Sequence, residues 1–208
     1  MRILDVLTYD RLILPHAEEQ RLIMSDISWE QYCTFSDSIR EEFPSLRITY
    51  LEGILEIMPT SSEHERLKTV IARLIEMYVV EREIGLDGYG STTFRKQEVL
   101  RGLEPDECYC LGELKEVPDI AIEINLTSEG INRLDVYCGL GIPEVWFWEV
   151  KKQKWHLYRL RNDVCELISK SEFLPELDFA LLTQFILVTN QNQTQIAIAY
   201  RNSLKSKD

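Results

Sequence analysis

The chain has 208 residues, a length that one α/β domain commonly fills, and its 45% hydrophobic and 28% charged residues are those of an ordinary globular protein. No uninterrupted apolar run approaches the roughly 18 residues that a membrane span requires, which argues against a membrane protein. The net charge of −12 is opposite in sign to the basic footprint of most nucleic-acid binders, and it counts against affinity for nucleic acid.

The N-terminus and the cysteines both favour a soluble, cytoplasmic protein. Residues 1–20 carry Asp5 and Asp10 inside their apolar stretch and have no small-residue cleavage site, so they make a poor signal peptide. Cys108 and Cys110 have no CxxC partner, and we expect small apolar residues on one side of a strand rather than zinc ligands. An odd number of cysteines without tight spacing does not predict a disulfide framework; the five stand at positions 33, 108, 110, 138 and 165.

The first predicted elements are a helix and a hairpin. Ser28 to Gln31 forms a capping box that opens a helix ending before Pro44. The β-branched and aromatic residues of Arg47–Leu51 and Ile54–Met58, separated by Glu52 and Gly53, predict a β-hairpin.

A long helix follows. Ser62 and Glu65 predict a second capping box, and apolar residues then recur at helical spacing up to Gly85. His64 lies at the N-terminal end of this helix, in register with its apolar face.

The second half of the chain alternates extended and helical segments. We expect extended structure over 86–94, 97–100, 104–111 and 117–125. A short helix over Gly130–Leu140 should lead into a hairpin of Glu144–Val150 and Trp155–Leu160, whose first strand is apolar on both faces and therefore buried. The region from Asp178 onward should be mostly helical.

The strand over Val117–Asn125 carries an unexpected carboxylate. Side chains alternate along a strand, so Ile120, Ile122 and Ile124 share one face while Glu123 lies on the other. A carboxylate in the middle of so apolar a strand is costly to desolvate unless it is paired or binds a cation. The alternative is an exposed polar face on an edge strand.

A second carboxylate, Asp106, belongs to the segment just before this strand. Pro105 cannot donate to a β-ladder, so it suits the opening of a strand and places Asp106 there. Neighbouring strands lie about 4.8 Å apart, so Asp106 and Glu123 converge if the two segments pair. Two such carboxylates suit a hard cation such as Mg²⁺, which activates water and neutralises charge in phosphodiester hydrolysis.

A "PD" at a strand start followed by a carboxylate on the next strand resembles the PD-(D/E)XK, or restriction-endonuclease-like, superfamily. Further motifs in order resemble the Uma-two family of bacterial endonucleases over roughly residues 25–200. They are Tyr50-Leu51-Glu52-Gly53, Met58-Pro59-x-Ser61-x-x-His64, Glu104-Pro105-Asp106, Pro118-Asp119-Ile120-Ala121-Ile122-Glu123 and Gly141-Ile142-Pro143-Glu144-Val145-Trp146.

The resemblance implies an α/β fold with a mixed central β-sheet flanked by helices, preceded by an N-terminal helix and β-hairpin. It implies one domain over 1–208, with a core of roughly 46–165 and a helical C-terminal region of roughly 175–205. It makes Asp106 and Glu123 the metal ligands and aligns the family's lysine with Arg133, while Asn125 stands at the superfamily's E-x-K lysine position. Arginine stays protonated, so Arg133 would hold a scissile phosphate oxygen or stabilise transition-state charge rather than activate water.

The sequence leaves two interpretations open for each of two further residues, His64 and Glu52. His64 is either a buried histidine packed under the helix cap or a ligand of phosphate or metal at the rim of the site, since a helix N-terminus favours anions. Glu52 is either a solvated turn residue or another carboxylate near the metal.

The leading hypothesis is a Mg²⁺- or Mn²⁺-dependent endonuclease that acts on DNA. A second hypothesis, favoured by Arg133 and Asn125, is a catalytically degenerate nuclease-like fold that serves as a nucleic-acid or protein binding module. A third, a hydrolase of smaller phosphoesters, fits the negative charge but has no motif of its own. The sequence leaves monomer and homodimer open, and it does not reveal whether the basic runs 95–96, 151–154 and 159–161 form one surface.

Overall fold

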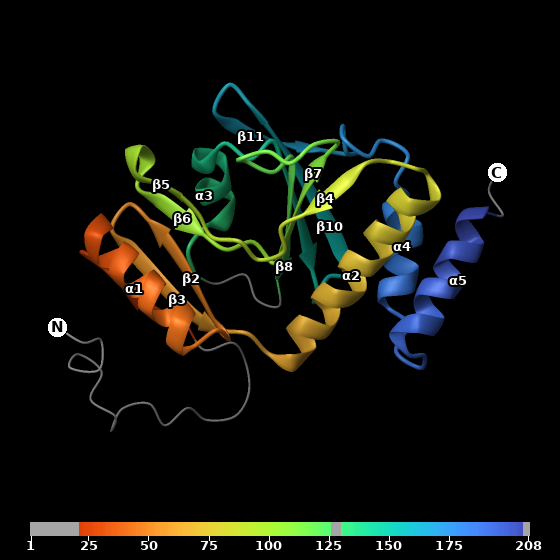
Figure 1. Cartoon of the computed structure of the whole chain (residues 1–208), viewed down its shortest axis with the longest axis horizontal. Coiled ribbons are helices and arrows are strands. Elements are labelled where there is room, and N and C mark those ends of the chain that lie inside the picture. Colours follow the sequence, from red (N-terminus) through yellow and green to blue (C-terminus); the bar gives the residue numbers. More distant parts are fainter. Residues whose placement is uncertain (1–20, 126–129, 206–208) are drawn as a thin grey trace.

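Two β-sheets with a helix between them organise the chain (Figure 1). The computed structural model describes residues 21–125 and 130–205. The segment 1–20, on which the signal-peptide expectation depends, lies outside these residues. Within the described part of the chain, no helix is long and apolar enough to cross a membrane.

The first sheet is antiparallel and is built around the predicted hairpin. Its five strands, in spatial order, are β1 (Leu22–Met24), β3 (Ile54–Pro59), β2 (Leu46–Leu51), β6 (Arg101–Leu103) and β5 (Phe94–Lys96). Helix α1 (Trp29–Glu42) covers one face, and the predicted capping box at Ser28 is present. Tyr32 of α1 stacks on Tyr50 of β2 with ring centroids 4.6 Å apart, in a core shared with Ile39 and Leu55.

The second sheet is mixed and carries the segments of chemical interest. In spatial order its strands are β11 (Val164–Ile168), β10 (Lys154–Arg161), β9 (Glu144–Glu149), β8 (Ile120–Asn125), β7 (Glu107–Leu111) and β4 (Leu86–Gly88). Among the strands of this sheet in the described residues, β8 and β9 alone pair in parallel. Parallel strands need a crossover connection, and helix α3 (Arg133–Leu140) supplies it.

Helices cover both faces of this mixed sheet. Helices α2 (Ser62–Glu81), α4 (Phe179–Ile186) and α5 (Gln193–Lys205) lie together on one face, where Ile120, Ile122 and Ile124 of β8 join the core with Trp146 and Trp148 of β9 (Figure 1). Helix α3 packs on the other face, against Ala121 and Phe147, and it also contacts the first sheet. The tryptophans therefore lie in the core, as the two-sided apolar pattern of their strand predicts.

Several local predictions were wrong. The cap of α2 is Ser61, whose side chain accepts a hydrogen bond from the backbone N–H of His64, and not Ser62 with Glu65. Gln97–Val99 is a single 3₁₀ turn rather than a strand, because Leu100 adopts a left-handed conformation with φ of 50°. Strand β7 begins at Glu107, so Asp106 lies just before it, and β11 was not predicted at all.

The cysteine spacing did not predict a disulfide, but the structure has one. Cys138 of α3 and Cys165 of β11 form a disulfide across 27 residues of sequence, with a Cα–Cα distance of 5.9 Å. Spacing rules miss such a bridge because it joins elements brought together only by the fold. Cys108 and Cys110 are free and buried on one side of β7, as predicted.

Candidate functional site

Asp106 and Glu123 come together because β7 and β8 pair. In this antiparallel register Glu107 lies opposite Ile122, so Asp106, one residue before β7, lies close enough to Glu123 for its charge to act on that carboxylate. Both carboxylates are buried, Asp106 at 2% exposure and Glu123 at 0%. The Oδ2 atom of Asp106 accepts a hydrogen bond from the backbone N–H of Ile124 at 2.7 Å, which fixes its position beside β8.

His64 is a direct partner of Asp106. The Ser61 cap orients the first turn of α2 so that the buried His64 ring points at the strands, and its Nε2 lies 3.1 Å from Asp106 Oδ2. Burial alone would lower the pKa of His64, but the hydrogen bond and charge of Asp106 outweigh it and raise the pKa above its ordinary value. Burial would raise the pKa of Asp106, yet His64 and the nearby Arg133 charge hold it below its ordinary range.

Glu123 is held by two side chains of α3. Arg133 Nη1 donates to Glu123 Oε2 at 2.5 Å, and the Tyr137 hydroxyl donates to Oε1. Burial, together with the negative charge of Asp106, raises the pKa of Glu123 to about 7, although Arg133 and Tyr137 both act to lower it. Glu123 in turn raises the pKa of Arg133, which therefore stays charged.

Helix geometry explains why Arg133 and Tyr137 act together. Asn132 caps α3 by accepting from the backbone N–H of Leu134, and residues four apart lie on the same face of a helix. Sequence reasoning singled out Arg133 but missed Tyr137. The available signal was the i, i+4 spacing of a hydroxyl from a residue already expected at the site.

Glu56 was also missed. It lies in β3 at 1% exposure, and its Oε2 accepts from the backbone N–H of Ile131 at 3.0 Å and lies 3.5 Å from Arg21 Nη1. Its charge contributes to the raised pKa of Arg133. A carboxylate within the apolar run of its strand was the same signal that identified Glu123, and it would have found Glu56.

In the described part of the chain, Glu52, Asn125 and Asp119 make no hydrogen bond or ion pair with this cluster. Glu52 has a 62% exposed side chain in the β2–β3 turn, where it pairs with Arg101 at 3.1 Å. Asn125 ends β8 half-buried, and its side chain makes no hydrogen bond to any residue that the structure describes. Asp119, four residues before Glu123, accepts from Lys115 at 2.5 Å and from the Leu111 backbone at 2.8 Å.

The basic runs are largely engaged with carboxylates. Each contains a cation that is ion-paired to a neighbouring acidic side chain: Arg95 to Asp37, Lys152 to Glu149, and Arg161 to Glu172. These cations therefore offset local negative charge and add little to any long-range attraction for polyanions.

The Asp106–Glu123 pair fits a hard divalent cation in its chemistry. Among the described residues, no group of three or more His, Cys, Asp or Glu side chains is arranged to hold a metal ion. Mg²⁺ does not require such a cage, because it keeps several waters and uses one or two carboxylates together with substrate phosphate. Two buried carboxylates that oppose each other's ionisation supply the negative charge that a cation would neutralise.

Comparisons with known proteins agree on a nuclease-like fold. A family model described as "Uma2: Putative restriction endonuclease" matches residues 29–190. A solved structure described as a "putative nuclease belonging to DUF820", from Anabaena variabilis, is similar with a TM-score of 0.50 and 16% identity; the match covers 67% of this chain and 91% of that one. At this identity the likeness concerns the fold alone. No curated protein matches the chain.

Proposed function

Because the chain belongs to the Uma2 family of restriction-endonuclease-like proteins, we propose that it is a Mg²⁺-dependent endonuclease that hydrolyses phosphodiester bonds of DNA. Mn²⁺ would serve as the cofactor in place of Mg²⁺. The observation that carries the proposal is the convergence of Asp106 and Glu123, from paired strands, into one buried cluster with Arg133.

Each residue of the cluster has a role that follows from its contacts. Asp106 and Glu123 would hold the cation, which when bound supplies charge neutralisation and an acidified water. His64 and the Ile124 backbone N–H orient Asp106 through its Oδ2 atom. Burial excludes bulk water from the carboxylates and strengthens their attraction for a cation.

The contacts of Arg133 support a role in binding the scissile phosphate. Its guanidinium lies 2.5 Å from Glu123, carries a charge at every physiological pH and presents several N–H donors in a plane. A non-bridging phosphate oxygen matches those donors, so Arg133 would bind the scissile phosphate beside the carboxylates that would hold the cation. Tyr137 would keep the other oxygen of Glu123 in place through its hydroxyl.

The direct test is cleavage of supercoiled plasmid by the purified chain with Mg²⁺ or Mn²⁺, and with a chelator as the blank. Divalent-dependent nicking is expected from the wild type and should disappear in Asp106→Asn, which keeps the shape and an acceptor oxygen. Lys151→Gln, an exposed change in the β9–β10 turn, serves as a matched control and should cleave normally. Equal cleavage by Asp106→Asn would reject the assignment.

A second candidate function is a degenerate nuclease-like fold that binds nucleic acid or protein without cleaving it. Arg133 and Tyr137 favour it, because they already occupy both oxygens of Glu123 and an arginine stands at the family's lysine position. Arg133→Lys separates the two candidates. Activity that appears only in Arg133→Lys supports the degenerate function, whereas activity already present in the wild type rejects it.

A further inference from the structure

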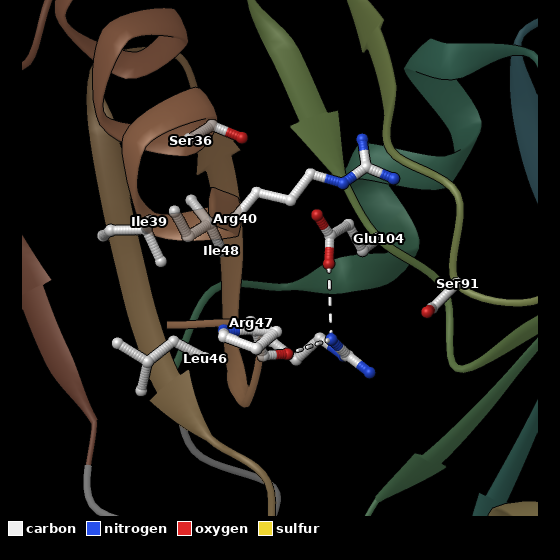
Figure 2. Close-up of a pocket in the computed structure, with 9 residues that line it drawn as sticks. Ser36, Ile39, Arg40, Leu46, Arg47, Ile48, Ser91 and Glu104 are labelled. Atoms are coloured by element: carbon white, nitrogen blue, oxygen red, sulfur yellow. Dashed lines mark hydrogen bonds and ion pairs between the residues drawn. The ribbon is translucent and has the colours of Figure 1, made fainter. Parts of the chain in front are cut away.

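A pocket of about 260 Å³ opens between α1, β2 and the segment before β5 (Figure 2). Ile39, Leu46 and Ile48 form an apolar wall on one side of it. Arg40, Arg47 and Glu104 bring charge to the same space, as Figure 2 shows. We call this cavity the Arg40 pocket.

The Arg40 pocket adjoins the proposed catalytic cluster through a short chain of polar contacts. Arg47 Nη2 lies 3.8 Å from the Glu65 carboxylate, and that carboxylate lies 3.7 Å from Nδ1 of His64. On the other side, Glu104 lies only two residues before Asp106. These two links connect the lining of the pocket to the carboxylate cluster.

Among the described residues, the charges that line the pocket leave the guanidinium of Arg40 without a partner. Both carboxylate oxygens of Glu104 already have partners. Thr93 donates a hydrogen bond to Oε1 at 2.8 Å, and Arg47 Nη1 lies 3.5 Å from Oε2. Arg47 is shared between Glu104 and Glu65, with its Nε buried and without an acceptor among the described residues. Arg40 is exposed and forms no ion pair or hydrogen bond within the part of the chain that the structure describes.

We propose that the Arg40 pocket binds one sugar–phosphate unit of the DNA strand, next to the phosphate that is cleaved; this inference rests on the proposed function. The guanidinium of Arg40 would hold the phosphate oxygens, with Arg47 behind it, and the apolar wall would take the carbon face of the sugar. A contact of this kind positions the strand without reading its bases.

Other occupants fit the pocket less well. A metal ion would meet two guanidinium groups and a carboxylate that is already neutralised. A lone inorganic phosphate would leave the apolar wall uncovered, since the cavity is larger than one phosphate and part of its lining is hydrocarbon. The position of Arg40 in the last turn of α1 also suits the helix dipole, a role that lysine would fill equally well.

The test is an NMR titration of the full ¹⁵N-labelled chain with deoxyribose 5-phosphate, with deoxyribose and inorganic phosphate as separate arms. Saturable shifts should appear at amides around Ser91 and Arg40, and they should be strongest for the phosphorylated sugar. Arg40→Gln should weaken binding roughly tenfold, as expected for a charge-assisted contact, and Arg40→Lys less. Lys151→Gln also removes one positive charge, at a residue that does not line the pocket, and should leave binding unchanged.

Two results would overturn the proposal: shifts that map elsewhere, or equal affinity in Arg40→Gln.

Cleavage assays distinguish failure of the pocket proposal from failure of the proposed nuclease function. In an active enzyme, Arg40→Gln should raise KM roughly tenfold with kcat unchanged, and it should reduce the dependence of log affinity on log salt by about one. Asp106-dependent cleavage with an unchanged KM in Arg40→Gln would reject the pocket alone. Sugar–phosphate binding in the pocket without any cleavage would reject the nuclease function and keep the pocket.

Discussion

The contact between Arg133 and Glu123 gives the sharpest stability prediction. Arg133→Met removes the guanidinium that lies 2.5 Å from a carboxylate with no exposed surface. Breaking a buried ion pair on one side leaves an uncompensated charge, so the free energy of unfolding should fall by about 3–5 kcal/mol at pH 8 in chelator.

The loss should depend on pH in a defined direction. The pKa of Glu123 is raised from its ordinary value of 4.5 to about 7, so the folded protein binds a proton more readily than the unfolded chain does. Its contribution to stability is therefore full below pH 4.5 and is lost as the pH rises to about 7, a change of about 3 kcal/mol. Without Arg133 the pKa of Glu123 rises further, so the variant should approach the wild type near pH 5.5.

Urea unfolding followed by tryptophan fluorescence at both pH values measures this effect. The control is the double variant Arg133→Met with Glu123→Gln, which removes both charges of this ion pair, so most of the stability at pH 8 should return. An equal loss at both pH values, with no recovery in the double variant, would refute the reasoning.

Three further predictions concern neighbouring contacts. Tyr137→Phe removes a hydroxyl that donates to a buried carboxylate and should cost about 2 kcal/mol in urea unfolding. Replacing Cys138 and Cys165 by serine opens a crosslink that spans 27 residues and should cost about 3 kcal/mol, so an unchanged melting temperature would contradict a formed disulfide. Glu56→Ala strips the backbone N–H of Ile131 of its acceptor and should cost about 1–3 kcal/mol, measured by the same unfolding assay.

The amino-acid sequence was most informative where a strand or helix pattern placed a carboxylate in a position where its burial costs free energy. Alternation along β8 located Glu123, and Pro105 placed Asp106 within one residue of the start of the preceding strand, β7, because both follow from local backbone rules. The pairing of those strands then brought the two carboxylates together. Helix α1 followed from the capping box at Ser28 and the stop before Pro44, and helix α2 followed from its apolar spacing.

What the sequence could not provide depends on contacts between distant segments. Ser61 and Ser62 are both good caps, and only the packing of the helix decides between them. The division of the strands into two sheets, and the bridge from Cys138 to Cys165, arise from tertiary contacts that no local pattern encodes. The single-domain organisation, the homodimer and the cytoplasmic location stay predictions.

The central claim is that Asp106 and Glu123 form a divalent-cation site. Its most direct test is a Mn²⁺ titration of the folded wild type and of Asp106→Asn, followed by the electron paramagnetic resonance signal of free Mn²⁺. The account predicts that the wild type binds a single ion per chain and that Asp106→Asn, with its circular dichroism spectrum unchanged, binds none. Equal binding by both proteins, or no binding by the wild type, would contradict it.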